Sequence, residues 1–308
     1  MPPSTPVALE PEIQAQFREA GRIARQAREF AISNIQVGVN QRALLDEVEA
    51  LIRSEGAGIA FPAQTSVNAC AAHACPPPGS DPVYQAEDVV KVDIGVEVNG
   101  YVADNAATKY LGEDPHLHKL VGASKAGLDA AMATIGPGVS VHQISTAIEA
   151  ALKAEGFAPV PNLTGHGVAR WCVHTSPQIP AVADSRDTVR LQPGMVVAIE
   201  PFASTSGGPV IEVGRAEVFM ITREPRKMKG IDPEVWQTIA NMNGLPFARC
   251  TFPASQRGET LETSLQRLRR TGCLMSFPPL TDPDPSVRIS QHEHTSIILE
   301  DGVEVITR

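Results

Sequence analysis

The feature that most constrains the fold of this chain is an internal repeat. Gly-Val-Asn at residues 38–40 recurs as Gly-Val-Ser at 138–140, and Glu-Gly at 55–56 recurs at 155–156. Each triplet ends on a residue type that caps helix N-termini, and each pair ends on the Gly favoured just beyond a helix C-terminus. The offset is 100 residues in both cases. The sequence therefore predicts two copies of one supersecondary unit, each carrying a helix between these marks.

In the first unit, a helix is also predicted over residues 11–33, where apolar residues recur at helical spacing. Residues 89–106 then predict a β-hairpin, because apolar residues run up to Asn99-Gly100 and resume after it. With these two residues as the loop, Asp93 and Asp104 become diagonal neighbours on one face, about 7–8 Å apart. Such carboxylates repel each other unless a cation or a shared proton lies between them.

Two interpretations of this acidic pair are open. The two acids could lie on the solvated face of a hairpin, or they could bind metal ions. Asp93 stands in an almost wholly apolar run, which favours a buried strand and hence a metal. The repeat supports this, since Glu200 corresponds to Asp93 at an offset of 107, and His174 corresponds to His73 at an offset of 101.

The second unit predicts a strand at 195–199, a turn at 207–208 and a return strand at 209–213. From about residue 222 to 287, helical patterns among Pro-rich links predict a helical insertion. Strand signals return from residue 290 to the end of the chain.

Composition limits the class of protein. The 308 residues carry a net charge of −9, which disfavours a specific nucleic-acid or anionic-membrane surface. None of the five cysteines forms a CxxC pair, so we expect free thiols in a reducing compartment. The first six residues lack a signal-peptide pattern, and no apolar run approaches the length of a membrane span. We expect a cytoplasmic protein.

One imidazole and four carboxylates are candidate metal ligands: Asp93, Asp104, His166, Glu200 and Glu293. This hard, oxygen-rich set suits two divalent ions such as Mn, Fe or Co better than a structural zinc. His166 lies between two glycines, which fits either a site or a plain turn, and Glu200 closes an apolar strand. Glu293 shares its strand parity with apolar residues and should face inward, which is costly without compensation.

The chain resembles methionine aminopeptidases of type 2, of the short kind without a long basic N-terminal extension. The matching motifs span nearly the whole chain in order: 61–62, 68–73, 92–95, 103–104, 162–166, 198–202, 245–247 and 293–295. The resemblance implies an α+β pita-bread fold, with a pseudo-twofold helix-helix-hairpin repeat around a curved antiparallel sheet. Residues 1–308 would form a single catalytic domain, with residues 222–287 as a helical insertion subdomain.

The resemblance also implies a role for each site residue. Asp104 and Glu293 would bridge two divalent ions (Co, Mn, Fe or Zn), with Asp93 completing one site and His166 and Glu200 the other. The catalytic residues would be His73, His174 and Glu293: Glu293 would take a proton from the attacking water, His174 would stabilise the intermediate, and His73 would help to protonate the leaving group. His73, His174, Phe61 and Phe247 would bind substrate, although both phenylalanines could equally be core residues.

Four residues at three places in the chain depart from the family pattern: Asn105, Thr175-Ser176 and Phe277. They place pocket detail and efficiency in question, and leave the reaction class unchanged.

The implied function is removal of the N-terminal methionine from nascent proteins whose second residue is small. The expected partners are the N-terminal Met of peptides and nascent chains, with the ribosome as a candidate contact and the chain as a monomer. Two alternatives remain open: a related aminopeptidase that cleaves before proline, and a catalytically weak relative that binds RNA or protein. A purely structural protein would not need four inward-facing acids.

Overall fold

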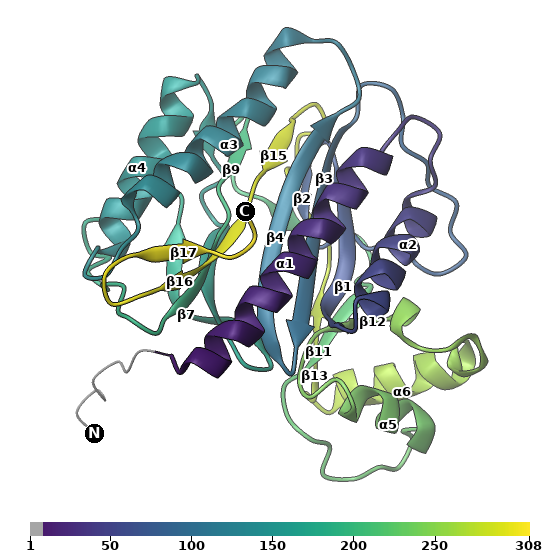
Figure 1. Ribbon diagram of the computed structural model, residues 1–308. Helices are drawn as coiled ribbons and strands as arrows, with labels where there is room; N and C mark the ends of the chain where they lie inside the picture. Colours follow the sequence, from purple (N-terminus) through teal and green to yellow (C-terminus); the bar gives the residue numbers. More distant parts are fainter. Residues whose placement is uncertain (1–8) are drawn as a thin grey trace.

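The structure, a computed structural model, describes residues 9–308. The first six residues, on which the expectation of no signal peptide rests, lie outside the described residues. Antiparallel sheets occupy the centre of the molecule, and helices cover them in two pairs, α1 (Pro11–Asn34) with α2 (Gln41–Ser54) and α3 (Pro115–Thr134) with α4 (Val141–Ala154) (Figure 1). The predicted α+β class is confirmed.

The first unit is a three-stranded antiparallel sheet covered by α1 and α2. Its strands, in the order β1-β3-β4, are β1 (Gly58–Val67), β3 (Val89–Val98) and β4 (Tyr101–Tyr110). Small and aliphatic residues of the two helices pack against the strands in one apolar cluster. The Asn40 side chain accepts a hydrogen bond from the backbone N–H of Ala43, as expected of the N-cap of α2.

The hairpin of β3 and β4 has the predicted register. Asn99 and Gly100 form its loop with φ values of 52° and 88°, the left-handed region that this turn needs. Asp93 pairs with Ala106, and Gly95 pairs with Asp104. The two acids therefore lie on one face of the sheet as diagonal neighbours.

The second unit repeats this arrangement around a five-stranded sheet. Its strands, in the order β17-β16-β8-β6-β7, are β6 (Thr164–Ala169), β7 (Cys172–Pro180), β8 (Val196–Ile199), β16 (His294–Ile298) and β17 (Val303–Val305). Ser140 caps α4 in a capping box with Gln143, matching Asn40 in the first unit. The series β6-β8-β16 corresponds to β1-β3-β4.

A short strand does lie within the predicted range 209–213, but its predicted role as the return arm of the hairpin is wrong. The strand that pairs with β8 is β16, from the C-terminal end of the chain, and β9 (Phe202–Ser204) continues β8 by pairing with β15 (Ile289–Gln291) and β5 (Ala158–Pro159). β10 (Ile211–Glu212) instead pairs with β14 (Leu280–Thr281), which pairs with β2 (Cys70–Ala72). The sequence showed a turn at 207–208, but this turn does not lead to the partner of β8. That partner, β16, begins about 90 residues later, beyond the insertion.

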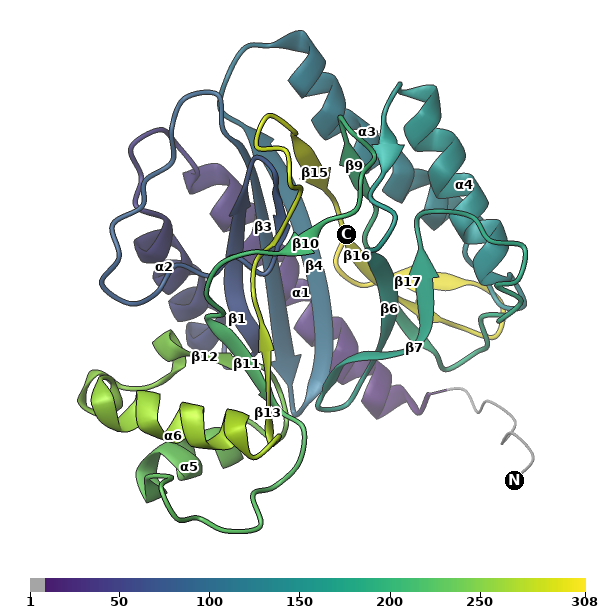
Figure 2. The same cartoon turned by 180° about the vertical axis from the view of Figure 1, so that it is seen from behind.

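The segment between the two arms carries an apolar cluster of its own, with members from Phe219 to Leu274. Its elements are β11 (Val218–Ile221), α5 (Pro233–Ala240), β12 (Phe247–Ala248), η1 (Arg249–Thr251), η2 (Ala254–Gln256), α6 (Glu259–Arg270) and β13 (Leu274–Phe277). Both helices were predicted. Figures 1 and 2 show α5 and α6 beneath the first unit, at the end remote from α3 and α4.

The turn of the β3–β4 hairpin in the first unit is hydrogen-bonded to the β6–β7 turn in the second unit. The backbone N–H of Trp171, at the β6–β7 turn, donates to the Gly100 carbonyl at 2.7 Å, and Arg170 Nε donates to the Asn99 carbonyl at 2.9 Å. A Cβ atom at Gly100 would lie 2.3 Å from the Trp171 ring, so only glycine permits this contact. The contact sets β4 beside β6, the two strands that carry Asp104 and His166.

Candidate active site

Three candidate ligands from three separate strands or strand ends meet in the interior. One ligand atom each of Asp104, His166 and Glu293 lies within 4.8 Å of the others, and all three side chains are buried. Asp104 comes from β4, His166 from β6, and Glu293 from the break between β15 and β16. At that break, the Glu293 backbone N–H donates to the Ala106 carbonyl of β4 at 3.0 Å. The C-terminal segment therefore brings its acid to the face of the first hairpin.

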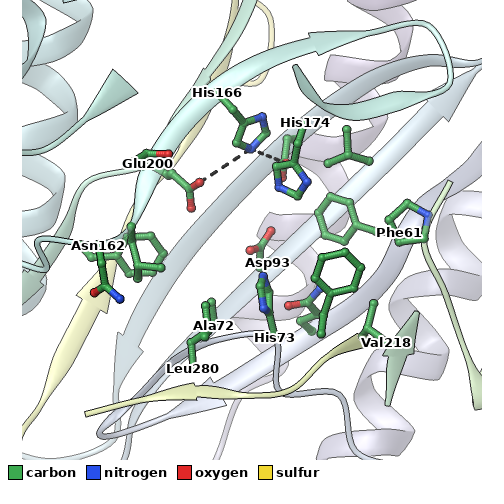
Figure 3. Close-up of a pocket in the computed structure, with 18 residues that line it drawn as sticks. Phe61, Ala72, His73, Asp93, Asn162, His166, His174, Glu200, Val218 and Leu280 are labelled. Atoms are coloured by element: carbon green, nitrogen blue, oxygen red, sulfur yellow. Dashed lines mark ion pairs between the residues drawn. The ribbon is translucent and has the colours of Figure 1, made fainter. Parts of the chain in front are cut away.

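His166 joins this group to Glu200 (Figure 3). Its Nε2 lies 3.7 Å from Asp104 Oδ2 and 3.7 Å from Glu200 Oε1, while its Nδ1 hydrogen-bonds to the Gly167 carbonyl at 3.1 Å. Fixing one ring nitrogen on the backbone and aiming the other at the acids is the usual arrangement of a metal-binding histidine. Asp93, the diagonal neighbour of Asp104 on the same face of the hairpin, lines the same cavity. The structure thus brings together all five candidate ligands.

The acids of this cluster have buried oxygens without a partner. Asp93 Oδ1, Asp104 Oδ1 and both carboxylate oxygens of Glu293 accept no hydrogen bond. Among residues 9–308, no lysine or arginine forms an ion pair with any of the four acids. Buried ionised carboxylates are very costly unless they are paired or coordinate a metal. The donor set therefore fits divalent cations with hard oxygen and imidazole ligands.

Burial also changes the protonation of the cluster. It raises the pKa of Asp93 to about 6, and burial together with neighbouring carboxylates raises the pKa values of Asp104, Glu200 and Glu293. Burial lowers the pKa of His166 to about 3, so this imidazole is neutral at pH 7 and free to act as a ligand. The raised carboxyl pKa values mean that protons compete with a cation for these oxygens, increasingly so as the pH falls.

We expect this competition to make metal stabilisation depend on pH. An unfolded carboxyl group has a pKa of about 4, whereas burial raises the folded-state pKa of Asp93 to about 6. The metal-free protein therefore loses stability as the pH rises from the lower of these values through the higher one. The rise in melting temperature on adding Mn²⁺ should therefore be larger at about pH 8 than at about pH 5.5. His166 is neutral at both pH values and adds no difference.

Melting curves recorded with Mn²⁺ and with a chelator at each pH measure this directly. The difference between the paired curves cancels the titration of histidines outside the cluster. An equal or smaller Mn²⁺-induced rise at the higher pH would contradict the arrangement.

Two further histidines face the same cavity, one from each unit. The His174 ring lies 4.3 Å from the His166 ring, and the His73 ring lies 5.6 Å from the Phe277 ring, both edge to face. Burial lowers the pKa of His73 to about 4, and surrounding protein also lowers that of His174, although its side chain is exposed to the cavity. Both imidazoles are therefore neutral at pH 7 and can donate or accept a proton.

The cavity beside the cluster has a volume of about 220 Å³. This is below the ~300–1,000 Å³ of sites for drug-sized ligands, so the space suits a single side chain. Its apolar wall comes from both units and from the insertion segment: Phe61, Ala72, Leu163, Val173, Phe202, Val218, Pro246, Phe277 and Leu280. The Phe61 ring packs directly on Gly95, where a Cβ atom would lie 2.2 Å from it.

Phe247, predicted as a second wall, does not line this cavity. It is buried in the apolar cluster of the insertion segment, with its ring 6.0 Å from Phe219 and 5.8 Å from Phe252. Its neighbour Pro246 faces the cavity instead, and Phe277, noted only as a departure from the family pattern, takes the place of the second aromatic wall. Pro246 and Phe247 are consecutive residues, so an error of one position exchanges a cavity-lining side chain for one of the insertion core.

Two glutamines at the site were not predicted. Gln291 is buried, and its Nε2 donates to Glu200 Oε2 at 3.1 Å, while buried Gln64 lines the cavity with Oε1 unpartnered. Gln291 shares strand parity with Glu293, so an inward-facing polar residue could have been inferred there. No signal in the sequence marked Gln64.

A buried oxygen-rich cluster, two neutral histidines and an adjoining apolar cavity are typical of a metal-dependent hydrolase. The chain belongs to metallopeptidase family M24, whose sequence model matches residues 15–230. A methionine aminopeptidase of Archaeoglobus fulgidus is 38% identical over 300 residues, which cover 97% of this chain and 99% of the relative.

Solved structures agree with the fold. A methionine aminopeptidase from Thermotoga maritima superimposes with a TM-score of 0.71 at 22% identity, covering 98% of this chain and 99% of the other. A thermophilic Arx1 gives a TM-score of 0.84 at 14% identity, covering 97% and 91%. The expected pita-bread fold is thereby confirmed. In residues 9–308, no helix combines the length and apolar character needed to cross a bilayer.

Proposed function

We propose that this chain is a methionine aminopeptidase that hydrolyses the first peptide bond of chains beginning with Met. The observation that carries the proposal is the junction of the acidic cluster with the apolar cavity. A cavity of about 220 Å³ with an apolar wall opens beside carboxylates whose buried oxygens lack partners. The curated relative of the same name, similar over almost the whole chain, supports the choice of substrate.

We also propose that two divalent ions occupy the cluster, held by Asp93, Asp104, His166, Glu200 and Glu293. When bound, such ions supply a nucleophile at neutral pH and stabilise charge that develops on the scissile carbonyl. The four carboxylates favour Mn, Fe or Co, with Zn as a further candidate. Asp104 is the candidate for the shared ligand, since it lies on the same hairpin face as Asp93 and its Oδ2 lies 3.7 Å from His166 Nε2.

Side chains of the protein then carry out the proton transfers and hydrogen bonding of the reaction. Glu293, whose buried carboxylate oxygens have no partner, takes a proton from the attacking water. His174, at the edge of the cluster, donates a hydrogen bond to the oxygen that gains charge in the transition state. His73, across the cavity, contacts the scissile amide and assists protonation of the departing amine. Phe61 and Phe277 hold the Met side chain.

We assign the chain to type 2 of the family, with residues 222–287 as an insertion subdomain of a single domain of residues 1–308. The helices α5 and α6 around a separate apolar cluster support this assignment. We further propose that it acts as a monomer on nascent chains in the cytoplasm, with the ribosome as a candidate contact. All five cysteines are free, which supports a reducing compartment.

Substrate profiling tests the proposal. We expect release of Met from peptides with Gly, Ala, Ser or Thr in second position, and at least ~100-fold lower kcat/KM when Leu or Lys follows, a difference of about 3 kcal/mol. The reason is that the second residue must lie against the crowded cluster.

Ala-Pro and Met-Pro peptides serve as the comparison for the proline-directed alternative. Cleavage of Ala-Pro in preference to Met-Ala would assign the chain to that activity. Equal cleavage of Met-Ala and Met-Lys would contradict the proposed pocket.

A further inference from the structure

Two cysteines far apart in the sequence meet beside the active site, outside the machinery proposed above. Cys75 lies in the segment after β2, and Cys250 lies in η1 of the insertion. Nη1 of Arg42, on α2, donates to both sulfurs at 3.6 Å. Both cysteines belong to one small buried cluster, and both thiols are free. Figures 1 and 2 show α2 beside β12, the strand that leads into η1.

The two thiols differ in accessibility and in acidity. Cys75 is buried with 5% exposure, whereas Cys250 is partly exposed. The neighbouring Cys75 thiol, aided by the Arg42 charge, lowers the pKa of Cys250, while proximity to Cys250 and burial raise the pKa of Cys75. Asp46 and Glu49 also lie near Arg42, at 3.0 and 3.9 Å, and oppose part of this effect. Cys250 is thus the better nucleophile and Cys75 the protected partner.

We propose that Cys75 and Cys250 form a redox-modified dithiol, which a peroxide converts to a disulfide that links the His73 segment to the insertion. The Cys250 thiolate attacks one peroxide oxygen, giving a sulfenic acid and releasing water or an alcohol. The Cys75 sulfur then attacks the sulfenic sulfur, the S–S bond forms, and a second water leaves. The dithiol loses two electrons and two protons in total, and the peroxide is reduced. An accessible low-pKa thiol next to a resolving cysteine is the pattern of known redox sensors.

Such a bond would disturb the active site through short connections. Cys75 is two residues after His73, whose backbone has a positive φ of 63°. Cys75 also packs in a small cluster with Val218 and Phe277, and both of these side chains line the cavity. Closing the S–S bond to about 2.05 Å moves both sulfurs inward from non-bonded contact. Because a displacement of ~1 Å can cost ~100-fold in rate, we expect at least a tenfold loss of kcat/KM.

The test uses the Mn²⁺-loaded full chain treated with a small excess of hydrogen peroxide, then alkylated and mapped without reduction. We expect two of the five thiols to disappear, with one cross-linked pair of peptides containing Cys75 and Cys250. Activity on a Met-Ala peptide should fall in parallel and return with dithiothreitol. The peptide map detects the disulfide without using peptide hydrolysis. It therefore tests the cross-link even if Met-Ala proves not to be a substrate.

Matched variants separate this site from general oxidation. Cys250→Ser and Cys75→Ser should each abolish the cross-link and leave activity resistant to the same peroxide dose. Cys172→Ser, which removes an exposed thiol, should respond as the wild type does. Three results would each overturn the proposal. These are a disulfide between other cysteines, a peroxide-induced loss of activity in Cys250→Ser as large as in the wild type, and a Cys75–Cys250 bond with unchanged activity.

Discussion

Asp104→Asn is expected to lower kcat/KM on Met-Ala peptides by at least about 10³-fold, and to reduce the number of tightly bound metal ions per chain. Asp104 is buried, its Oδ1 has no partner, and its Oδ2 lies 3.7 Å from His166 Nε2. Asparagine keeps the shape but removes the charge that a shared ligand must supply. Loss of metal-based charge stabilisation worth several kcal/mol corresponds to a factor of this size.

Metal-free protein provides a second measurement for the same variant. Since neighbouring carboxylates oppose one another in the cluster, removing one should leave the melting temperature of chelator-treated protein unchanged or raise it at pH 8. A loss of activity through misfolding would lower it. Asp88→Asn is the control, because that acid is buried immediately before β3 but accepts hydrogen bonds from Asn68 and Gln85. Two tightly bound ions with wild-type turnover in Asp104→Asn would refute the assignment.

His174→Ala is expected to lower kcat by about 100-fold with little change in KM, the signature of an interaction made mainly in the transition state. The ring stands at the edge of the cluster, 4.3 Å from His166, rather than deep in the apolar cavity. His174→Gln retains a hydrogen-bond donor and should recover part of the loss.

Steady-state kinetics with metal content measured in parallel checks this prediction. His118→Ala, which alters an exposed histidine on α3, should behave as the wild type. A rise in KM at unchanged kcat in His174→Ala would instead make the histidine a ground-state binding residue.

Local signals in the sequence were sufficient for the hairpin and the helices. Asn99-Gly100 determines the register of β3 and β4, and that register alone puts Asp93 and Asp104 on one face. Asn40 and Ser140 revealed the repeat because they cap the N-termini of the corresponding helices α2 and α4.

Long-range pairing was harder to predict. Gly207-Gly208 gave a turn signal, but nothing local indicates that the partner of β8 comes from β16, beyond the insertion. A one-residue error placed Phe247 in the pocket, where Pro246 and Phe277 lie. Gln64 was not predicted because a single buried amide produces no repeating pattern in the sequence.

Metal titration of the chelator-treated enzyme with a Met-Ala peptide as substrate tests the central claim most directly. We predict no turnover without metal, and activity that rises with added Mn²⁺ or Co²⁺ until two ions are bound per chain. Full turnover of Met-Ala by metal-free protein, or metal binding that leaves the peptide uncleaved, would contradict it.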